Sequence, residues 1–216
     1  SERITSLLNV ETFASEGFVF MATKNGEVKK TPIGDFKLPR KSGKRAIKLD
    51  NSDELVGTAI TSGTNDLMLI SDAGKAVYFN EKDARPMGRD TRGVKGITLE
   101  EKQSVIALIM PNNDNEILTV SENGFGKRSK VEDFRKTKRG AKGVIAMQLS
   151  ERNGKLISAN QVSEENQVIL ISNKGTLVRT KVSEISVIGR NTQGVRVIKL
   201  KANEKLNGMA LAIEND

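Results

Sequence analysis

The feature that most constrains this chain is an internal repeat of about 50 residues that is marked by glycines. Each of four segments contains a β-prone stretch, a turn glycine, a second such stretch, a basic loop, a second glycine and two more β-prone stretches. The turn glycines are spaced by 48, 50 and 51 residues, and the second glycines by 50, 50 and 51. The two sets are Gly26, Gly74, Gly124 and Gly175, and Gly43, Gly93, Gly143 and Gly194. Such a period indicates one supersecondary unit that is stacked repeatedly.

The pattern inside each repeat predicts four β-strands. In the first repeat we expect strands over 18–23, 27–31, 44–49 and 54–61, with Asn25-Gly26 as the hairpin turn. No helical periodicity persists for three turns, and with no Trp, one Tyr and seven Phe the core must come mainly from Val, Ile and Leu. We therefore expect an all-β, propeller-like fold of four four-stranded blades. The predicted repeats are 17–65, 66–115, 116–166 and 167–216.

Two further strand predictions concern the ends of this pattern. The second glycine of each later repeat is expected to begin a strand, over 94–99, 144–149 and 195–200. Residues 3–10 resemble the last strand of a repeat, so residues 1–16 are expected to hold the last strand of a preceding blade that this sequence lacks.

Charge is sorted by the phase of the repeat. The windows 26–49, 74–99, 124–149 and 175–200 hold 27 of the 35 Lys and Arg residues and 8 of the 27 Asp and Glu residues. Because equal phases of a repeat protein occupy equivalent places, this sorting predicts one basic surface and one acidic surface. A long basic surface is what a polyphosphate backbone needs, so we expect binding to double-stranded DNA.

The candidate DNA-binding residues recur at fixed offsets from the glycines. In three of four repeats a cation stands four residues after the turn glycine, and in three an arginine stands four residues before the second glycine. Cations beside glycine-rich backbone suit phosphates, and the sequence shows no recognition helix, so binding should be independent of sequence and sensitive to salt. The candidates are Lys29, Lys30, Arg40, Lys41, Lys44, Arg45, Arg89, Arg92, Lys95, Lys127, Arg128, Arg135, Lys136, Lys138, Arg139, Lys142, Arg179, Lys181, Arg190 and Arg196.

The composition excludes several classes of site. The chain has no Cys and no His, which removes thiolate chemistry, the usual zinc ligands and the commonest general base. Tyr78, the single tyrosine, has no activating base beside it in sequence, so we expect no catalytic residue and no metal site. No apolar run is long enough to span a membrane, and no secretory signal is visible. We expect a cytoplasmic protein without a membrane partner or a small-molecule substrate.

Three segments carry a family resemblance. The stretch 175–194 and the motifs Asn123-Gly-Phe-Gly-Lys-Arg128 and Met87-Gly-Arg-Asp-Thr-Arg-Gly-Val-Lys-Gly96 resemble the C-terminal domain of bacterial DNA gyrase A, over essentially the whole chain. The resemblance implies a β-pinwheel of six blades, of which this chain matches the last four, whose basic rim wraps duplex DNA. It implies a non-catalytic part of a type IIA topoisomerase that supercoils DNA negatively. The ATPase, the metal-binding carboxylates and the breakage tyrosine lie elsewhere in that assembly, so no cofactor is expected here and ATP and Mg belong to other parts.

The resemblance also implies partners and leaves alternatives open. The partners are the rest of gyrase A and the gyrase B polypeptide, two copies of each, at the bacterial chromosome. The family's gyrase-A box, Gln-Arg-Arg-Gly-Gly-Lys-Gly, belongs to its first blade and has no counterpart in this sequence. One alternative is the related C-terminal domain of topoisomerase IV. Another alternative is a propeller-type scaffold for protein interaction, which would bind its partners through the acidic surface. A DNA-binding domain is expected to bind random duplex DNA in a salt-dependent way, and a scaffold is not.

Overall fold

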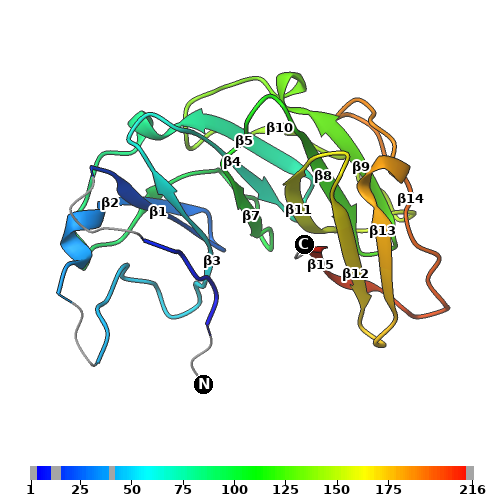
Figure 1. Ribbon diagram of the computed structural model, residues 1–216, viewed down its shortest axis with the longest axis horizontal. Helices are drawn as coiled ribbons and strands as arrows, with labels where there is room; N and C mark the ends of the chain where they lie inside the picture. Colours follow the sequence, from blue (N-terminus) through cyan, green and yellow to red (C-terminus); the bar gives the residue numbers. More distant parts are fainter. Residues whose placement is uncertain (1–3, 11–15, 39–41, 213–216) are drawn as a thin grey trace. The chain divides into compact units, whose positions relative to one another are not determined.

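A computed structural model describes residues 4–10, 16–38 and 42–212, and its regular structure is almost entirely β (Figure 1). The strands are β1 (Phe18–Thr23), β2 (Glu27–Pro32), β3 (Leu55–Thr61), β4 (Asp66–Ser71), β5 (Lys75–Asn80), β6 (Val94–Lys95), β7 (Val105–Ile109), β8 (Glu116–Ser121), β9 (Phe125–Lys130), β10 (Val144–Ile145), β11 (Leu156–Val162), β12 (Gln167–Ser172), β13 (Leu177–Lys181), β14 (Val195–Arg196) and β15 (Leu206–Ala212). Four 3₁₀ turns follow strands: η1 (Ile33–Phe36), η2 (Glu81–Asp83), η3 (Val131–Asp133) and η4 (Val182–Glu184). None of these helical turns is long or apolar enough to cross a bilayer. The predicted all-β class is confirmed.

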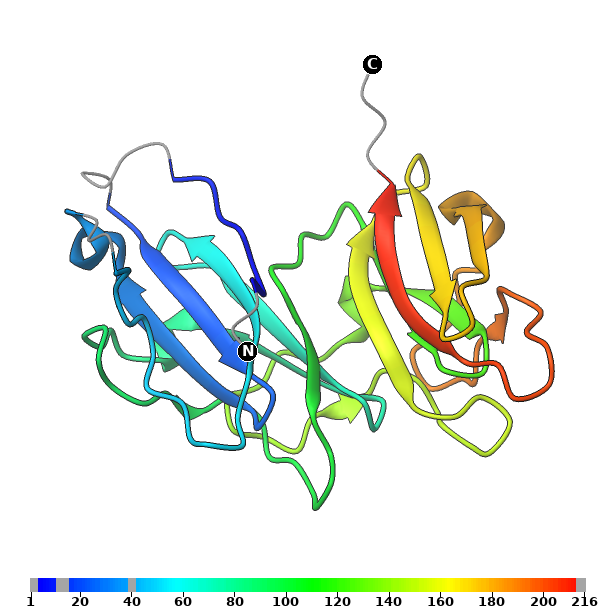
Figure 2. The ribbon, with the colours of Figure 1, turned by 90° about the horizontal axis from the view of Figure 1, so that it is seen from below.

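The strands form four sheets. Their strand orders are β3-β1-β2-β6, β10-β5-β4-β7, β11-β8-β9-β14 and β13-β12-β15. Within the described residues the fourth sheet therefore has three strands, not the expected four, with β12 between β13 and β15 (Figure 2).

Each sheet is built around a β-hairpin, and the turn of each hairpin contains one of the four predicted turn glycines. The amide of Gly26 donates to the oxygen of Thr23 at 3.0 Å, and the other three hairpins are closed in the same way. The four turn glycines have φ between +72° and +85°, a left-handed conformation that favours a residue without a Cβ. Gly74 has a second constraint, because a Cβ there would lie 2.4 Å from the main-chain oxygen of Met147.

The second set of glycines meets two different constraints. Gly43, Gly143 and Gly194 have positive φ. Gly93 does not, but a Cβ at Gly93 would lie 2.8 Å from the main-chain oxygen of Val28. Close approach of the backbone is thus what requires glycine at this position.

The short strand after the second glycine belongs to the sheet of the preceding repeat. Strand β6 pairs antiparallel with β2, β10 with β5, and β14 with β9. The expectation that these strands complete their own repeat, over six residues each, is therefore wrong. Each of these strands ends after two residues because its partner strand reaches its hairpin turn there. After β6, for example, the amide of Gly96 donates to the oxygen of Gly26, which is the turn glycine of the partner hairpin.

Two expected strands are not formed. Residues 44–49 and 4–10 contain no strand, and the side chains of Ile4 and Leu7 are 91% and 93% exposed. A β-ladder needs a partner backbone, and the described residues include no strand of an earlier repeat that could pair with either segment. Residues 1–3 and 11–15 of this prediction lie outside the described residues.

Interactions between residues divide the chain into two compact units. Unit 1 consists of the described residues within 1–69, 77–110 and 136–143. Unit 2 consists of those within 70–76, 111–135 and 144–216. In each unit the core lies between consecutive sheets: Phe20 and Ala22 of β1 pack with Leu67 and Leu69 of β4 in unit 1. In unit 2, Leu118 and Val120 of β8 pack with Val168 and Leu170 of β12. Consecutive residues of β4 and β8 are buried, so neighbouring elements cover both faces of these two strands, whereas exposed and half-buried residues alternate along β13.

Candidate nucleic-acid interface

The basic loop of each later repeat lies along the hairpin of the repeat before it. An amide of the loop donates to a main-chain oxygen of the hairpin's second strand, four residues after the turn glycine. These bonds are Met87 N to Lys30 O (2.8 Å), Thr137 N to Tyr78 O (2.7 Å) and Ile188 N to Arg128 O (2.9 Å). The loop of one repeat and the hairpin of the previous one therefore build one surface.

One predicted DNA-binding arginine in each loop holds the loop to the preceding repeat. Arg139 donates through Nε to the oxygen of Asp83 at 2.8 Å and through Nη1 to the oxygen of Lys95 at 2.9 Å. The equivalent bonds of Arg190 reach Asp133 O at 2.9 Å and Ile145 O at 3.0 Å, and Arg89 bonds through Nη1 to Arg45 O at 3.2 Å. These three arginines are half-buried, so part of each guanidinium is used inside the protein.

Lys29 and Lys127, three residues after a turn glycine, are fully buried. The Nζ of Lys127 donates to Ser129 Oγ at 2.8 Å, Arg190 O at 2.9 Å and Gly189 O at 3.1 Å. Lys29 likewise donates to three main-chain oxygens, those of Ala46 (2.8 Å), Thr91 (3.0 Å) and Arg89. Burial lowers the pKa of Lys127 to about 8, so the ammonium remains the main form at neutral pH.

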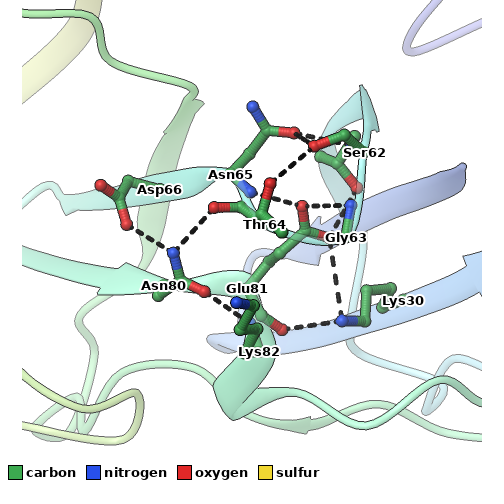
Figure 3. A network of polar contacts seen from close by, with 10 residues as sticks. Lys30, Ser62, Gly63, Thr64, Asn65, Asp66, Asn80, Glu81 and Lys82 are labelled. Carbon is green, nitrogen blue, oxygen red and sulfur yellow. Dashed lines mark hydrogen bonds and ion pairs between the residues drawn. The ribbon is translucent and has the colours of Figure 1, made fainter.

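Lys30 is also buried, in the polar network of Figure 3. Its Nζ donates to the main-chain oxygen of Glu81 at 3.0 Å and lies 3.8 Å from the Glu81 carboxylate. That carboxylate is itself fully buried and accepts from the amides of Gly63 and Asn65 and from the Thr61 hydroxyl, each at 2.8 Å. In the other three repeats the position of Glu81 holds Ile or Val, so the buried charge could not be inferred from the repeat pattern.

Arg128 takes the corresponding place in unit 2. It is 3% exposed and donates through Nε to the oxygen of Ile185 at 2.7 Å, with the carboxylates of Glu116 and Glu164 at 3.4 and 3.5 Å. The prediction that Lys29, Lys30, Lys127 and Arg128 contact DNA is therefore wrong for this structure. The next repeat covers both faces of their strands, and their charges hold that repeat in place.

The remaining candidates divide by exposure. The exposed ones are Arg45, Arg92, Lys95, Arg135, Lys136, Lys138, Lys142, Arg179, Lys181 and Arg196. Lys44, like the three loop arginines, is half-buried, and Arg40 and Lys41 lie outside the described residues. Three of the exposed cations face carboxylates: Arg45 pairs with Asp90 (3.2 Å), Lys136 with Asp66 (2.5 Å), and Arg92 with Glu27 (3.0 Å) and Asp50. The hydrogen bond to Asp66 raises the pKa of Lys136.

Unit 1 presents a group of exposed lysines, Lys95, Lys138 and Lys142, which we name the Lys138 cluster. None of the three has a carboxylate within 4 Å in the part of the chain that the structure describes. Their loop lies against β6 and the residues after it, since the Gly140 amide donates to Gly96 O at 2.6 Å and the Thr98 amide to Ala141 O at 2.9 Å. The sequence-based prediction of an exposed basic loop is met best here.

Unit 2 also carries exposed cations, and two of them lie over an aromatic ring. Arg135 and Lys181 are exposed and have no carboxylate within 4 Å among the described residues. The guanidinium of Arg196 lies over the ring of Phe125, 4.9 Å from its centroid, and that of Arg152 lies 4.5 Å from the same centroid. Arg152 stands outside the basic windows, so the charge pattern gave no signal for it.

The described residues contain no group of three or more His, Cys, Asp or Glu side chains that could hold a metal ion. The hydroxyl of Tyr78 donates to Asp66 at 3.4 Å, and burial raises the Tyr78 pKa, which works against a nucleophilic phenolate.

Comparison with known proteins bears on this arrangement. Residues 17–62, 65–112, 115–163 and 166–212 match the family described as DNA gyrase C-terminal domain, beta-propeller. The chain is 47% identical over 213 residues to the DNA gyrase A polypeptide of Escherichia coli (strain K12), covering 99% of this chain and 24% of that protein. A crystal structure of the C-terminal domain of DNA topoisomerase IV superposes with a TM-score of 0.87 at 26% identity, over 94% of this chain and 64% of the other. A structure of a DNA gyrase A C-terminal domain gives 0.82 at 28% identity, over 95% and 69%.

Proposed function

This chain belongs to the DNA gyrase C-terminal domain family, and from that premise we propose that it binds and bends duplex DNA through the basic loops of its repeats. The chain spans about a quarter of the length of the Escherichia coli gyrase A polypeptide. The supercoiling activity of a whole enzyme, and its assembly with the rest of gyrase A and with gyrase B in the bacterial cytoplasm, are therefore part of the proposal.

The observation that carries the proposal is the Lys138 cluster. Lysines without carboxylate partners retain their full attraction for phosphate, whereas paired ones such as Lys136 must first give up an ion pair. Lys138 and Lys142 lie on a loop that is fixed to the neighbouring repeat at Arg139, and Lys95 lies in β6, so the charges of the cluster are held on an ordered backbone. DNA binding of this kind reads phosphates and not bases, and it needs no cofactor.

Bending requires more than one such loop. Smooth bending of a site of about 20–30 bp costs on the order of 1–6 kcal/mol, which several phosphate contacts must offset. The repeat supplies equivalent loops at Arg89, Arg139 and Arg190, each fixed to the repeat before it. Within unit 1, the consecutive loops at Arg89 and Arg139 are thus suited to contact successive stretches of one duplex.

The experiment is a double charge reversal in the Lys138 cluster. We expect Lys138→Glu/Lys142→Glu to weaken binding of random duplex DNA and to reduce the slope of log K against log salt by about 0.9 for each phosphate that is no longer neutralised. The matched control is Lys102→Glu/Lys174→Glu, which changes the net charge equally at exposed lysines outside the basic windows. Equal losses of affinity in both variants, or binding by the wild type that does not respond to salt, would contradict the proposal.

A second candidate is the role of a topoisomerase IV C-terminal domain, since such a domain superposes well on this chain. That role would also rest on duplex binding, so the charge reversal tests it equally. The identity to gyrase A over nearly the whole chain favours gyrase. The third alternative, a protein-interaction scaffold, predicts no loss of function on reversal of the Lys138 cluster.

A further inference from the structure

The buried ammonium of Lys127 sets the direction of peptide groups in the loop of the fourth repeat. Two of its three acceptors are the consecutive carbonyl oxygens of Gly189 and Arg190. In a trans peptide the C=O of one residue and the N–H of the next point in opposite directions, and the described residues contain no cis peptide. The amides of Arg190 and Asn191 are therefore directed away from Lys127.

These two amides have no hydrogen-bond acceptor among the residues that the structure describes. Gly189 and Asn191 are exposed, and Arg190 is half-buried beside them. Two adjacent N–H groups that face away from a buried ammonium, on an exposed loop, form a concentration of positive charge suited to an oxyanion.

The loop of the second repeat has a similar arrangement of a buried lysine bound to loop carbonyl oxygens. Lys29 binds the oxygens of Arg89 and Thr91, which directs the amides of Asp90 and Arg92 away from the buried ammonium. Here the loop includes Asp90, whose carboxylate adds a negative charge. The loop of the fourth repeat, with Asn191 at that position, is the better anion site.

The buried lysine and the loop sequence occur together within this chain. Lys29 and Lys127 each precede a loop of the form Gly-Arg-x-Thr, at 88–91 and 189–192. In both loops the threonine hydroxyl donates to the glycine oxygen, at 2.9 and 2.8 Å. In the second repeat the lysine is replaced by Val77, and the loop that follows is Lys-Arg-Gly-Ala at 138–141.

We propose that residues 189–192 are a binding site for the phosphodiester oxygens of duplex DNA, and that Lys127 is the positioning residue that keeps the amides of Arg190 and Asn191 facing the ligand. Residues 88–91 and Lys29 are the weaker equivalent. This inference rests on the proposed function and identifies atoms for it. It also explains why a cation buried beyond the reach of DNA stands in a basic window.

The first test follows the backbone amides of the whole 216-residue chain by NMR during titration with random duplex DNA. We expect the Arg190 and Asn191 resonances to shift with the same midpoint as overall binding. Lys127→Met, which removes the ammonium and keeps the length of the side chain, should weaken binding about tenfold and make the salt slope shallower by about 0.9 for each phosphate released from the site. Unchanged affinity and slope in Lys127→Met would overturn the inference.

Two further variants separate positioning from general stability. Ile117→Val trims a buried side chain of unit 2 without touching the loop, and it should bind DNA like the wild type. Lys127→Val combined with Gly189→Lys, Asn191→Gly and Thr192→Ala recreates the pairing of valine with the Lys-Arg-Gly-Ala loop of the third repeat. Recovery of loop amide protection and of DNA affinity in this variant supports the coupling between lysine and loop, and failure to recover contradicts it.

Inorganic phosphate distinguishes failure of this inference from failure of the proposed function. If the wild type binds duplex DNA while the two amides stay unshifted, only the site is wrong. If the wild type does not bind duplex DNA, phosphate titration still tests the site. A shift of the Arg190 and Asn191 amides in the wild type that is absent in Lys127→Met supports it, and equal shifts in both refute it.

Discussion

The guanidinium of Arg139 donates to the main-chain oxygen of Lys95, 2.9 Å away, and so ties the loop of the third repeat to the short strand of the second. Both residues were expected to contact DNA. Lys95 is exposed, whereas Arg139 is half-buried and uses its Nε on the oxygen of Asp83 as well. A basic residue in this surface can therefore bind ligand or hold the loop that binds it.

Arg139→Met should destabilise the protein more than Lys142→Met. The arginine loses two hydrogen bonds to main-chain oxygens, which costs about 1–3 kcal/mol, whereas a lysine without a partner at the surface contributes within about 0.5 kcal/mol. Both variants lose one positive charge, so the difference between their urea unfolding curves isolates the bonds. Equal free energies of unfolding would show that the two bonds contribute little.

Gly74→Ala should cost more stability than Gly175→Ala. Both glycines have positive φ, +72° and +81°, so each alanine carries a strain of about 1–2 kcal/mol. At Gly175 a Cβ meets nothing within 4 Å, but at Gly74 it would lie 2.4 Å from the oxygen of Met147. Thermal unfolding of the two variants compares strain alone with strain plus a backbone clash, and a larger loss in Gly175→Ala would disprove this reasoning.

Glu81→Val should be strongly destabilising although valine occupies the same position in two other repeats. It leaves the buried ammonium of Lys30 without its carboxylate and the amides of Gly63 and Asn65 without an acceptor, a loss of about 3–5 kcal/mol. Lys30→Met/Glu81→Val should lose less than the sum of the two single changes. A double-mutant cycle measures this coupling, and strict additivity would argue against the ion pair.

Glu204 should make the free energy of unfolding depend on pH in the acidic range. Hydrogen bonds from the hydroxyls of Ser172 and Thr176 and from the amide of Lys201 lower its pKa from 4.5 to about 2. A carboxylate whose pKa is lower in the folded state stabilises that state above pH 4.5, and this stabilisation is lost as the pH falls towards 2. The free energy of unfolding should therefore fall more steeply over this range in the wild type than in Glu204→Gln, and parallel curves would contradict the assignment.

The hairpins were predictable because their signals are local. A turn glycine between two β-prone stretches specifies a hairpin whatever surrounds it, and β1 and β2 begin at the predicted residues 18 and 27. The segment 44–49 was mispredicted because it carries the same local pattern as residues 94–95 and 144–145 but lacks a described partner strand. Pairing between repeats is not a property of the segment alone.

The sequence by itself determined the repeat, the turns and the phase in which positive charge collects, since all three follow from residue types at fixed spacings. Only the tertiary structure decided which cations reach solvent. Lys127 and Lys142 stand in the same basic window, yet one is buried under the next repeat and the other is exposed. The physical reason is that neighbouring elements cover both faces of β9, so the usual alternation of buried and exposed residues along a strand does not apply to it.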